Sequence, residues 1–253
     1  MNIINVEHLT KDYGFGRGVF DVSIHVAQGE VFGFLGPNGA GKSTTIRHLM
    51  GFSEPDDGKV EIFGEPTFEK YYKVLKKVGY VPGEIALPAG LTGKEFLKMM
   101  QDLTGIHNEE RLKMLLELFE LDEASLLGDV KRMSLGVKRK LAVVSAFMSD
   151  PEVLILDEPT SGLDPLMRVT FFDIIKEEHK KGKTIFMSSH NFEELEGTCD
   201  KVALISDGHI IDVCDMDRIN NPAEKEFKIE FRNEADYKNF SFLFFVQRAS
   251  ASF

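Results

Sequence analysis

The feature that most constrains this chain is a glycine-rich loop over residues 36–44 that ends in Lys42-Ser43-Thr44. It follows the apolar run Val31–Leu35, which predicts a short buried strand, and precedes Thr45–Met50, which predicts the opening of a helix. Glycines let successive backbone N–H groups turn inward as an anion nest, and the positive end of the helix points at the same place. Strand, loop and helix together predict a P-loop that binds a nucleotide triphosphate.

Side chains of this loop have expected roles. Lys42 is predicted to reach the β- and γ-phosphates, and the Ser43 hydroxyl is predicted to ligate Mg²⁺. The residues expected to contact the nucleotide are Gly36, Asn38, Gly39, Ala40, Gly41, Lys42, Ser43 and Thr44.

Composition limits the possible partners. The chain has 253 residues, with 41 acidic against 30 basic side chains and a net charge of −11. That balance argues against a broad nucleic-acid-binding face, so no nucleic-acid partner is expected. No signal peptide begins the chain, and no apolar run approaches the roughly 20 residues of a membrane helix. We therefore expect a cytosolic protein whose membrane role depends on a partner. Cys199 and Cys214 match no metal or redox motif, which predicts buried free thiols.

The order of hydrophobic patterns predicts an α/β fold. Ile3–Val6 and Val19–Val26 have strand-type composition and predict an antiparallel N-terminal pair. Strand patterns alternate with a helix predicted at 167–180, which implies a mostly parallel sheet covered on both sides. The later predicted strands are 59–63, 78–81, 153–157, 184–188, 202–205 and 209–213, with turns at 55–58 and 207–208.

The spacing of apolar residues changes from a strand pattern to a helix pattern between residues 85 and 150. Thr92 and Glu95 fit a capping box, and a second helix is predicted after Asn108. We interpret 85–150 as a helical subdomain inserted into a core formed by 1–84 and 151–220. The remaining tail, 221–253, has no assigned structure; within it 226–232 alternates like a strand and 240–246 is apolar.

A pair of acids follows the four apolar residues 153–156. Asp157, at the tip of a buried strand, is expected to hold Mg²⁺ beside Ser43. Glu158 is placed to polarise an attacking water. The alternative is that Asp157 and Glu158 are merely two solvated acids at the end of a strand. The presence of a P-loop in the same chain makes the catalytic interpretation the favoured one.

The run from Leu154 to Pro165, which reads Leu-Ile-Leu-Asp-Glu-Pro-Thr-Ser-Gly-Leu-Asp-Pro, resembles the Walker B motif and D-loop of an ABC transporter ATPase. The resemblance covers roughly residues 2–215 and implies a P-loop ATPase core with ATP and Mg²⁺. It assigns catalysis to Lys42, Glu158 and the switch histidine His190, which contacts the γ-phosphate in the family. It also assigns adenine stacking to Tyr13.

The signature loop departs from the family pattern Leu-Ser-Gly-Gly-Gln. Residues 133–137 read Met-Ser-Leu-Gly-Val and are followed by Lys-Arg-Lys. In the family this loop opens a helix and faces the nucleotide held by the other subunit. The resemblance therefore implies that Ser134 and Gly136 contact the nucleotide of the other subunit. It also implies a nucleotide contact for Asp164 of the D-loop. Val137 lacks the side-chain amide of the family glutamine, and we expect this difference to affect the rate of ATP hydrolysis.

A second departure lies at the family's Q-loop. The family glutamine helps to ligate Mg²⁺ and links the core to the helical insertion, and this chain has Gly83 between Pro82 and Glu84. The hypothesis is that Glu84 or a water takes over as ligand.

The resemblance implies the ATP-hydrolysing subunit of a bacterial export cassette. Such a subunit pairs with a second copy or a paralogous ATPase subunit around ATP, and it drives a separate transmembrane permease from the inner face of the cell membrane. The permease selects the substrate. Two alternatives stay open: a soluble ABC ATPase acting on DNA or ribosomes, and a catalytically slow nucleotide-binding regulatory module.

Overall fold

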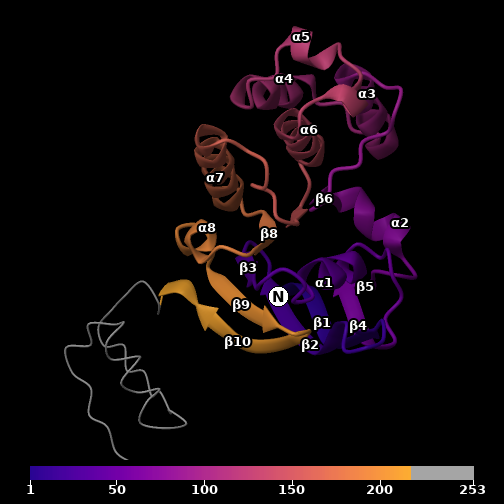
Figure 1. Ribbon diagram of the computed structural model, residues 1–253, viewed down its shortest axis with the longest axis vertical. Helices are drawn as coiled ribbons and strands as arrows, with labels where there is room; N and C mark the ends of the chain where they lie inside the picture. Colours follow the sequence, from indigo (N-terminus) through magenta and orange to yellow (C-terminus); the bar gives the residue numbers. More distant parts are fainter. Residues whose placement is uncertain (218–253) are drawn as a thin grey trace, which may run out of the picture. The chain divides into compact units, whose positions relative to one another are not determined.

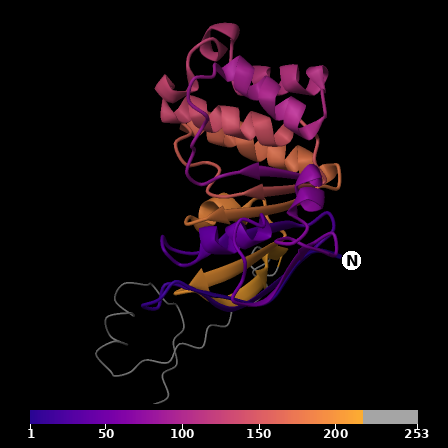
Figure 2. The same ribbon diagram turned by 90° about the vertical axis from the view of Figure 1, so that its right-hand side faces the viewer.

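The computed structural model describes residues 1–217. The strand expected at 226–232, the apolar segment 240–246 and the whole tail 221–253 lie outside this range. The described chain contains two sheets with helices between and around them (Figures 1 and 2).

The first sheet is antiparallel, with strand order β2-β1-β4-β5. Its strands are β1 (Asn2–Asp12), β2 (Gly18–Ala27), β4 (Asp57–Ile62) and β5 (Glu65–Pro66). The predicted pairing of two N-terminal strands is confirmed. The predicted turn at 55–58 ends earlier than expected, because Asp57 already pairs with Thr10 of β1.

The second sheet has strand order β10-β9-β3-β8-β7-β6. Strands β9, β3, β8, β7 and β6 run parallel, and β10 joins the edge antiparallel through a hairpin at 207–208. The bounds are β3 (Val31–Leu35), β6 (Val78–Val81), β7 (Val153–Leu156), β8 (Thr184–Ser189), β9 (Lys201–Ser206) and β10 (His209–Asp215). The expected α/β core with a mostly parallel sheet is confirmed.

The helices fall into two groups. Helices α1 (Lys42–Leu49), α2 (Tyr71–Val74), α7 (Pro165–Lys180) and α8 (Phe192–Glu196) accompany the strands. Helices α3 (Gly93–Thr104), α4 (Glu109–Leu118), α5 (Glu123–Leu126) and α6 (Leu135–Phe147) lie together (Figure 1). Short 3₁₀ turns cover Leu75–Lys77 and Val130–Arg132. The predicted capping box of Thr92 and Glu95 and the Asn108 cap are confirmed.

Alternate residues of the parallel strands enter two different hydrophobic clusters. Phe32 and Phe34 of β3 pack with α1 and the antiparallel sheet. Leu154 and Leu156 of β7 pack with helices α3, α6 and α7 on the opposite side. Both faces of the parallel sheet are therefore buried, as such sheets require.

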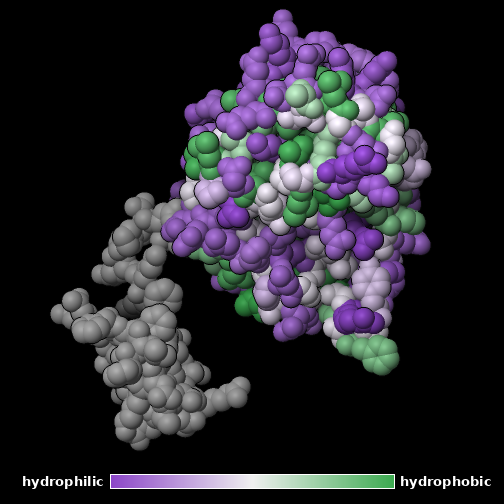
Figure 3. Space-filling model, turned by 45° about the horizontal axis from the view of Figure 1, so that its top comes forward, coloured by the Kyte–Doolittle hydropathy of each residue, from purple (hydrophilic) through white to green (hydrophobic). Residues whose placement is uncertain are grey.

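Hydrophilic residues cover most of the face shown in Figure 3, with smaller groups of hydrophobic residues between them. Within residues 1–217 no helix has the length and apolar character needed to cross a membrane. Both cysteines are free thiols; Cys199 is buried, whereas Cys214 is only half-buried, contrary to the expectation that both are buried. Burial raises the pKa of the Cys199 thiol.

Candidate nucleotide site

Four chain segments meet at the carboxyl edge of the parallel sheet. The glycine loop follows β3, Asp157 follows β7, His190 follows β8, and the Pro82-Gly83 segment follows β6. Strand β8 lies between β3 and β7, so the histidine segment leaves the sheet between the strand that leads to the loop and the strand that leads to the acid pair. This edge is where open α/β sheets bind ligands.

The glycine loop ends in a helix whose amino terminus is free for an anion. Gly41 precedes α1 with φ 110°, a conformation that favours glycine, and no side chain of the described residues caps the helix. The first turn of α1 contains no acidic residue. By contrast, side chains cap α3, α4, α6 and α7. The first N–H groups of a helix have no intrahelical partner, so those of α1 fit a phosphate.

Lys42 is buried and points back into the loop. Its Nζ donates to the carbonyl oxygens of Gly36 at 2.6 Å and Pro37 at 3.1 Å. Nζ also lies 3.2 Å from Oε1 of Glu158, an ion pair that is not aligned as a hydrogen bond. The ammonium group therefore sits where the loop, the helix terminus and the acid pair meet.

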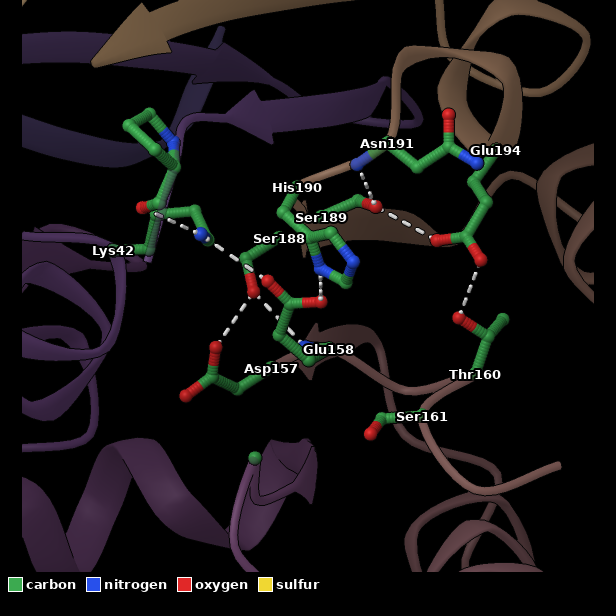
Figure 4. A network of polar contacts seen from close by, with 12 residues as sticks. Lys42, Asp157, Glu158, Thr160, Ser161, Ser188, Ser189, His190, Asn191 and Glu194 are labelled. Atoms are coloured by element: carbon green, nitrogen blue, oxygen red, sulfur yellow. Dashed lines mark hydrogen bonds and ion pairs between the residues drawn. The ribbon is translucent and has the colours of Figure 1, made fainter. Parts of the chain in front are cut away.

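Ser188 orients the acid pair from the neighbouring strand. Its Oγ donates to Oδ1 of Asp157 at 2.6 Å and accepts from the backbone N–H of Glu158 at 3.0 Å (Figure 4). Ser188 and Asp157 are both buried. Burial and the charge of Asp157 raise the pKa of Tyr80 to about 12. Sequence reasoning did not assign this role to Ser188; the available signal was its position at the end of the strand adjacent to that of Asp157.

The Glu158 carboxylate contacts two of the predicted catalytic side chains. Its Oε2 lies 2.7 Å from Nδ1 of His190, and its Oε1 faces Lys42 (Figure 4). Glu158 has φ 45°, a left-handed backbone that is uncommon for a non-glycine residue and typical of strained sites. The structure thus brings Lys42, Glu158 and His190 together.

Glu194 of α8 connects two of these segments. It accepts from Thr160 Oγ1 at 2.8 Å and from Ser189 Oγ at 2.7 Å, and Ser189 in turn accepts from the N–H of Asn191 at 3.0 Å (Figure 4). The loop after the acid pair is therefore tied to the strand end that carries His190. Sequence reasoning missed Glu194, because no motif marks a residue 34 positions away from its partner Thr160.

The remaining predicted contact residues lie in a turn, at helix caps or near the D-loop. Tyr13 is half-exposed in the turn after β1. Ser134 caps α6 by accepting from the N–H of Val137, and Asp164 caps α7 by accepting from the N–H of Met167. Gly136 lies against the D-loop, since a Cβ there would be 3.2 Å from the carbonyl oxygen of Gly162. Nucleotide contacts by Tyr13, Ser134, Gly136 and Asp164 stay predictions.

The expected Mg²⁺ ligands are few. Ser43 lies on the first turn of α1, and Asp157 directly follows β7. Across residues 1–217 no group of three or more His, Cys, Asp or Glu side chains gathers to hold a metal. This donor set fits Mg²⁺, which usually binds one or two carboxylates together with substrate phosphates and water.

The segment that lacks the family glutamine packs directly on Asp157. A Cβ on Gly83 would lie 2.9 Å from Oδ2 of Asp157, so this backbone leaves no room for a side chain without adjustment. Glu84, the hypothetical substitute ligand, is exposed, and its role stays a prediction.

A glycine loop on an uncapped helix, with a buried lysine opposite two acids at the carboxyl edge of a parallel sheet, defines a P-loop nucleotide-hydrolysing protein. The ABC transporter family matches residues 19–161, and the chain belongs to this family. It is an ATPase and the ATP-binding subunit of a transporter.

Individual relatives agree with this membership. The bacitracin transport ATP-binding protein BcrA of Bacillus licheniformis is 38% identical over 241 residues, covering 92% of this chain and 77% of the relative. The Nod factor export ATP-binding protein I of Paraburkholderia xenovorans (strain LB400) is 37% identical, with 82% and 69% covered. A solved ATP-binding subunit of an ABC transporter matches with a TM-score of 0.79 at 32% identity, covering 86% of this chain and 91% of that one.

Proposed function

We propose that this chain is the ATP-hydrolysing subunit of an ABC exporter, working from the cytoplasmic face of the membrane on a separate permease. The observation that carries the proposal is the Glu158 carboxylate, which lies between Lys42 at the end of the glycine loop and His190 after β8. Here a base, a phosphate-binding cation and a polar imidazole lie within one small site.

The chemistry follows from these contacts. In phosphoryl transfer the protein mainly positions the phosphates and neutralises charge that develops on them. Lys42 and the free N–H groups of α1 would hold the β- and γ-phosphates. Mg²⁺, held by Ser43 and Asp157, would supply further neutralisation of phosphate charge. Glu158 would orient the attacking water, and His190 would contact the γ-phosphate.

The Lys42–Glu158 ion pair suggests an order of events. A γ-phosphate beside Lys42 would compete with Glu158 for the ammonium group, because both are anions seeking the same cation. Once Lys42 turns to the phosphate, Oε1 of Glu158 becomes available to accept a proton from water. ATP binding would then prepare its own hydrolysis.

Dimerisation would complete the site. We propose that Ser134 and Gly136 face the nucleotide of a second copy or of a paralogous ATPase subunit, with Asp164 nearby. Ser134 and Asp164 are exposed, which supports this role. A solved ATP-binding cassette of the same fold is described as dimeric in a post-hydrolysis state with ADP and Pi, at 22% identity and a TM-score of 0.76. Residues 85–150 would move as a helical subdomain against 1–84 and 151–220 during closure.

Export is supported by the names of relatives. They include Nod factor export proteins and a linearmycin resistance protein of Bacillus subtilis (strain 168), the latter 36% identical over 212 residues. The transported substrate would be selected by the permease.

A steady-state ATPase assay with and without Mg²⁺ tests the proposal. We expect Mg²⁺-dependent ATP turnover in the wild-type chain and its loss in the Lys42→Ala variant. Absence of turnover in the wild-type chain, with ATP binding retained, would favour the slow regulatory module, an alternative supported by Val137 in the signature loop. Co-purification of a membrane permease with the tagged chain tests the transporter role against a soluble ATPase.

A further inference from the structure

Arg139 is a buried cation in the first half of α6, downstream of Ser134. Its side chain is among the largest that the fold buries completely, at 1% exposure. Its guanidinium donates to three backbone carbonyls: Nε to Ser161 at 2.9 Å, Nη1 to Pro82 at 2.6 Å and Nη2 to Gly83 at 2.7 Å. One side chain therefore joins α6 to two loops of the core.

Both loops flank Asp157. Gly83 packs on this carboxylate, since a Cβ on Gly83 would lie 2.9 Å from Oδ2, and the N–H of Asp157 donates to the carbonyl of Val81 at 2.8 Å. Ser161 lies on the loop that continues from Asp157 and Glu158. Any shift of the guanidinium would therefore move the backbone on both sides of the acid pair.

The negative charges of this pair also act on Arg139. The three oxygens that accept its hydrogen bonds are neutral carbonyls. Burial lowers the pKa of Arg139, and the negative charges of Asp157 and Glu158 oppose this shift. A guanidinium stays protonated in proteins and holds its donors in a rigid plane. Burying such a cation is unfavourable unless it is well bonded, so three aligned carbonyls and two nearby acids account for its place.

We propose that Arg139 is a positioning residue for ATP hydrolysis, which transmits the position of α6 to Asp157 through Pro82, Gly83 and Ser161. The link between the helical segment and the core, which the family glutamine provides, is here made by a guanidinium that reaches from α6 to the core loops. Because Ser134 opens the same helix, movement of the signature loop would reach the Mg²⁺-binding acid of its own chain. This inference rests on the proposed function.

Arg139→Lys tests the geometry, because it keeps the charge and loses the planar set of three donors. Arg139→Gln is a second variant that keeps an amide donor without charge. The matched control is Arg111→Lys. Arg111 of α4 also joins the helical segment to the core, through an ion pair with Glu178 of α7 at 2.9 Å, and it donates to the carbonyl of Phe147 at the end of α6, away from the acid pair. ATPase rate, Mg²⁺ dependence, ATP affinity without Mg²⁺ and thermal unfolding are measured for each.

For Arg139→Lys we expect kcat to fall by about tenfold to a hundredfold, since small displacements of reacting groups have effects of that size. The Mg²⁺ concentration for half-maximal activity should rise, with ATP affinity in the absence of Mg²⁺ kept. Arg111→Lys should lower the unfolding temperature without changing the Mg²⁺ dependence.

Two results overturn the inference. The first is an unchanged kcat and Mg²⁺ dependence in a folded Arg139→Lys or Arg139→Gln protein. The second is a loss of activity that follows the loss of stability equally in the Arg139 and Arg111 variants, which would make Arg139 purely structural. Absence of Mg²⁺-dependent hydrolysis in the wild-type chain would instead contradict the proposed function, so the two failures are distinguishable.

Discussion

The ammonium nitrogen of Lys42 lies 3.2 Å from Oε1 of Glu158, so the phosphate-binding lysine and the proposed base form an ion pair across the site. The other carboxylate oxygen of Glu158 contacts His190 at 2.7 Å. The three side chains come from three segments, and each position depends on its own strand. The proposed phosphate ligand Lys42 and the proposed base Glu158 are therefore close enough for phosphate binding to affect the activation of water.

Replacing Glu158 with Gln should remove the proton acceptor and keep the shape of the side chain. We expect turnover to fall by at least about a hundredfold, within the range for loss of a general base, while ATP binding persists. An ATP-bound dimer should then accumulate, visible as a larger species in size-exclusion chromatography with ATP. A Glu158→Gln protein that turns over ATP normally would contradict the assigned role.

Replacing Ser188 with Ala should disturb the acid pair without touching the glycine loop. The change leaves a buried oxygen of Asp157 and the N–H of Glu158 without their hydroxyl partner, and such losses typically cost about 1–3 kcal/mol. We expect a lower free energy of unfolding and a lower kcat. Ser145→Ala is the control, because Ser145 is a buried serine of α6 whose hydroxyl donates to the carbonyl of Ala142 in the same helix. It should leave kcat unchanged.

Replacing Gly36 with Ala should be destabilising. A Cβ there would lie 2.4 Å from the carbonyl oxygen of Ile205, so either the loop or β9 must shift. Overpacking of this kind costs roughly 1–3 kcal/mol, measured by chemical denaturation. ATP affinity should fall as well, because the loop moves. Gly197→Ala has open space at the Cβ position and should change neither quantity.

The stability of the protein should depend on His48 in acid. Burial lowers the pKa of His48 below 6.5, although hydrogen bonding to the Thr44 carbonyl opposes this effect. The unfolded chain therefore binds this proton more readily than the folded one. The His48 contribution to the free energy of unfolding is fully present above pH 6.5 and is lost as the pH falls towards the lowered pKa.

Denaturation curves between about pH 5 and 8 check this prediction. Removing the histidine in His48→Gln should flatten the decline of unfolding free energy below pH 6.5. His25→Gln, at an exposed position, should leave the decline as it is in the wild type. Equal slopes for wild type and His48→Gln would show that His48 does not carry the effect.

Local patterns were sufficient for most of the elements. The Thr92–Glu95 capping box and the Asp207-Gly208 hairpin were predictable because capping and turn formation depend on neighbours in sequence. The glycine loop was predictable for the same reason. Boundaries were less accurate, as at Asp57, where pairing with Thr10 extends the strand into the expected turn.

By itself, the sequence determined the glycine loop, the α/β alternation and the acid pair at Asp157 and Glu158, because each is encoded within a short stretch. Only the tertiary structure decided what surrounds the acids: the Ser188 hydroxyl, the Glu194 bridge and the Arg139 guanidinium. The contacts of Arg139 alone join residues 22 to 57 positions apart. All of these contacts depend on strand order and on the placement of α6 and α8, which no local pattern specifies.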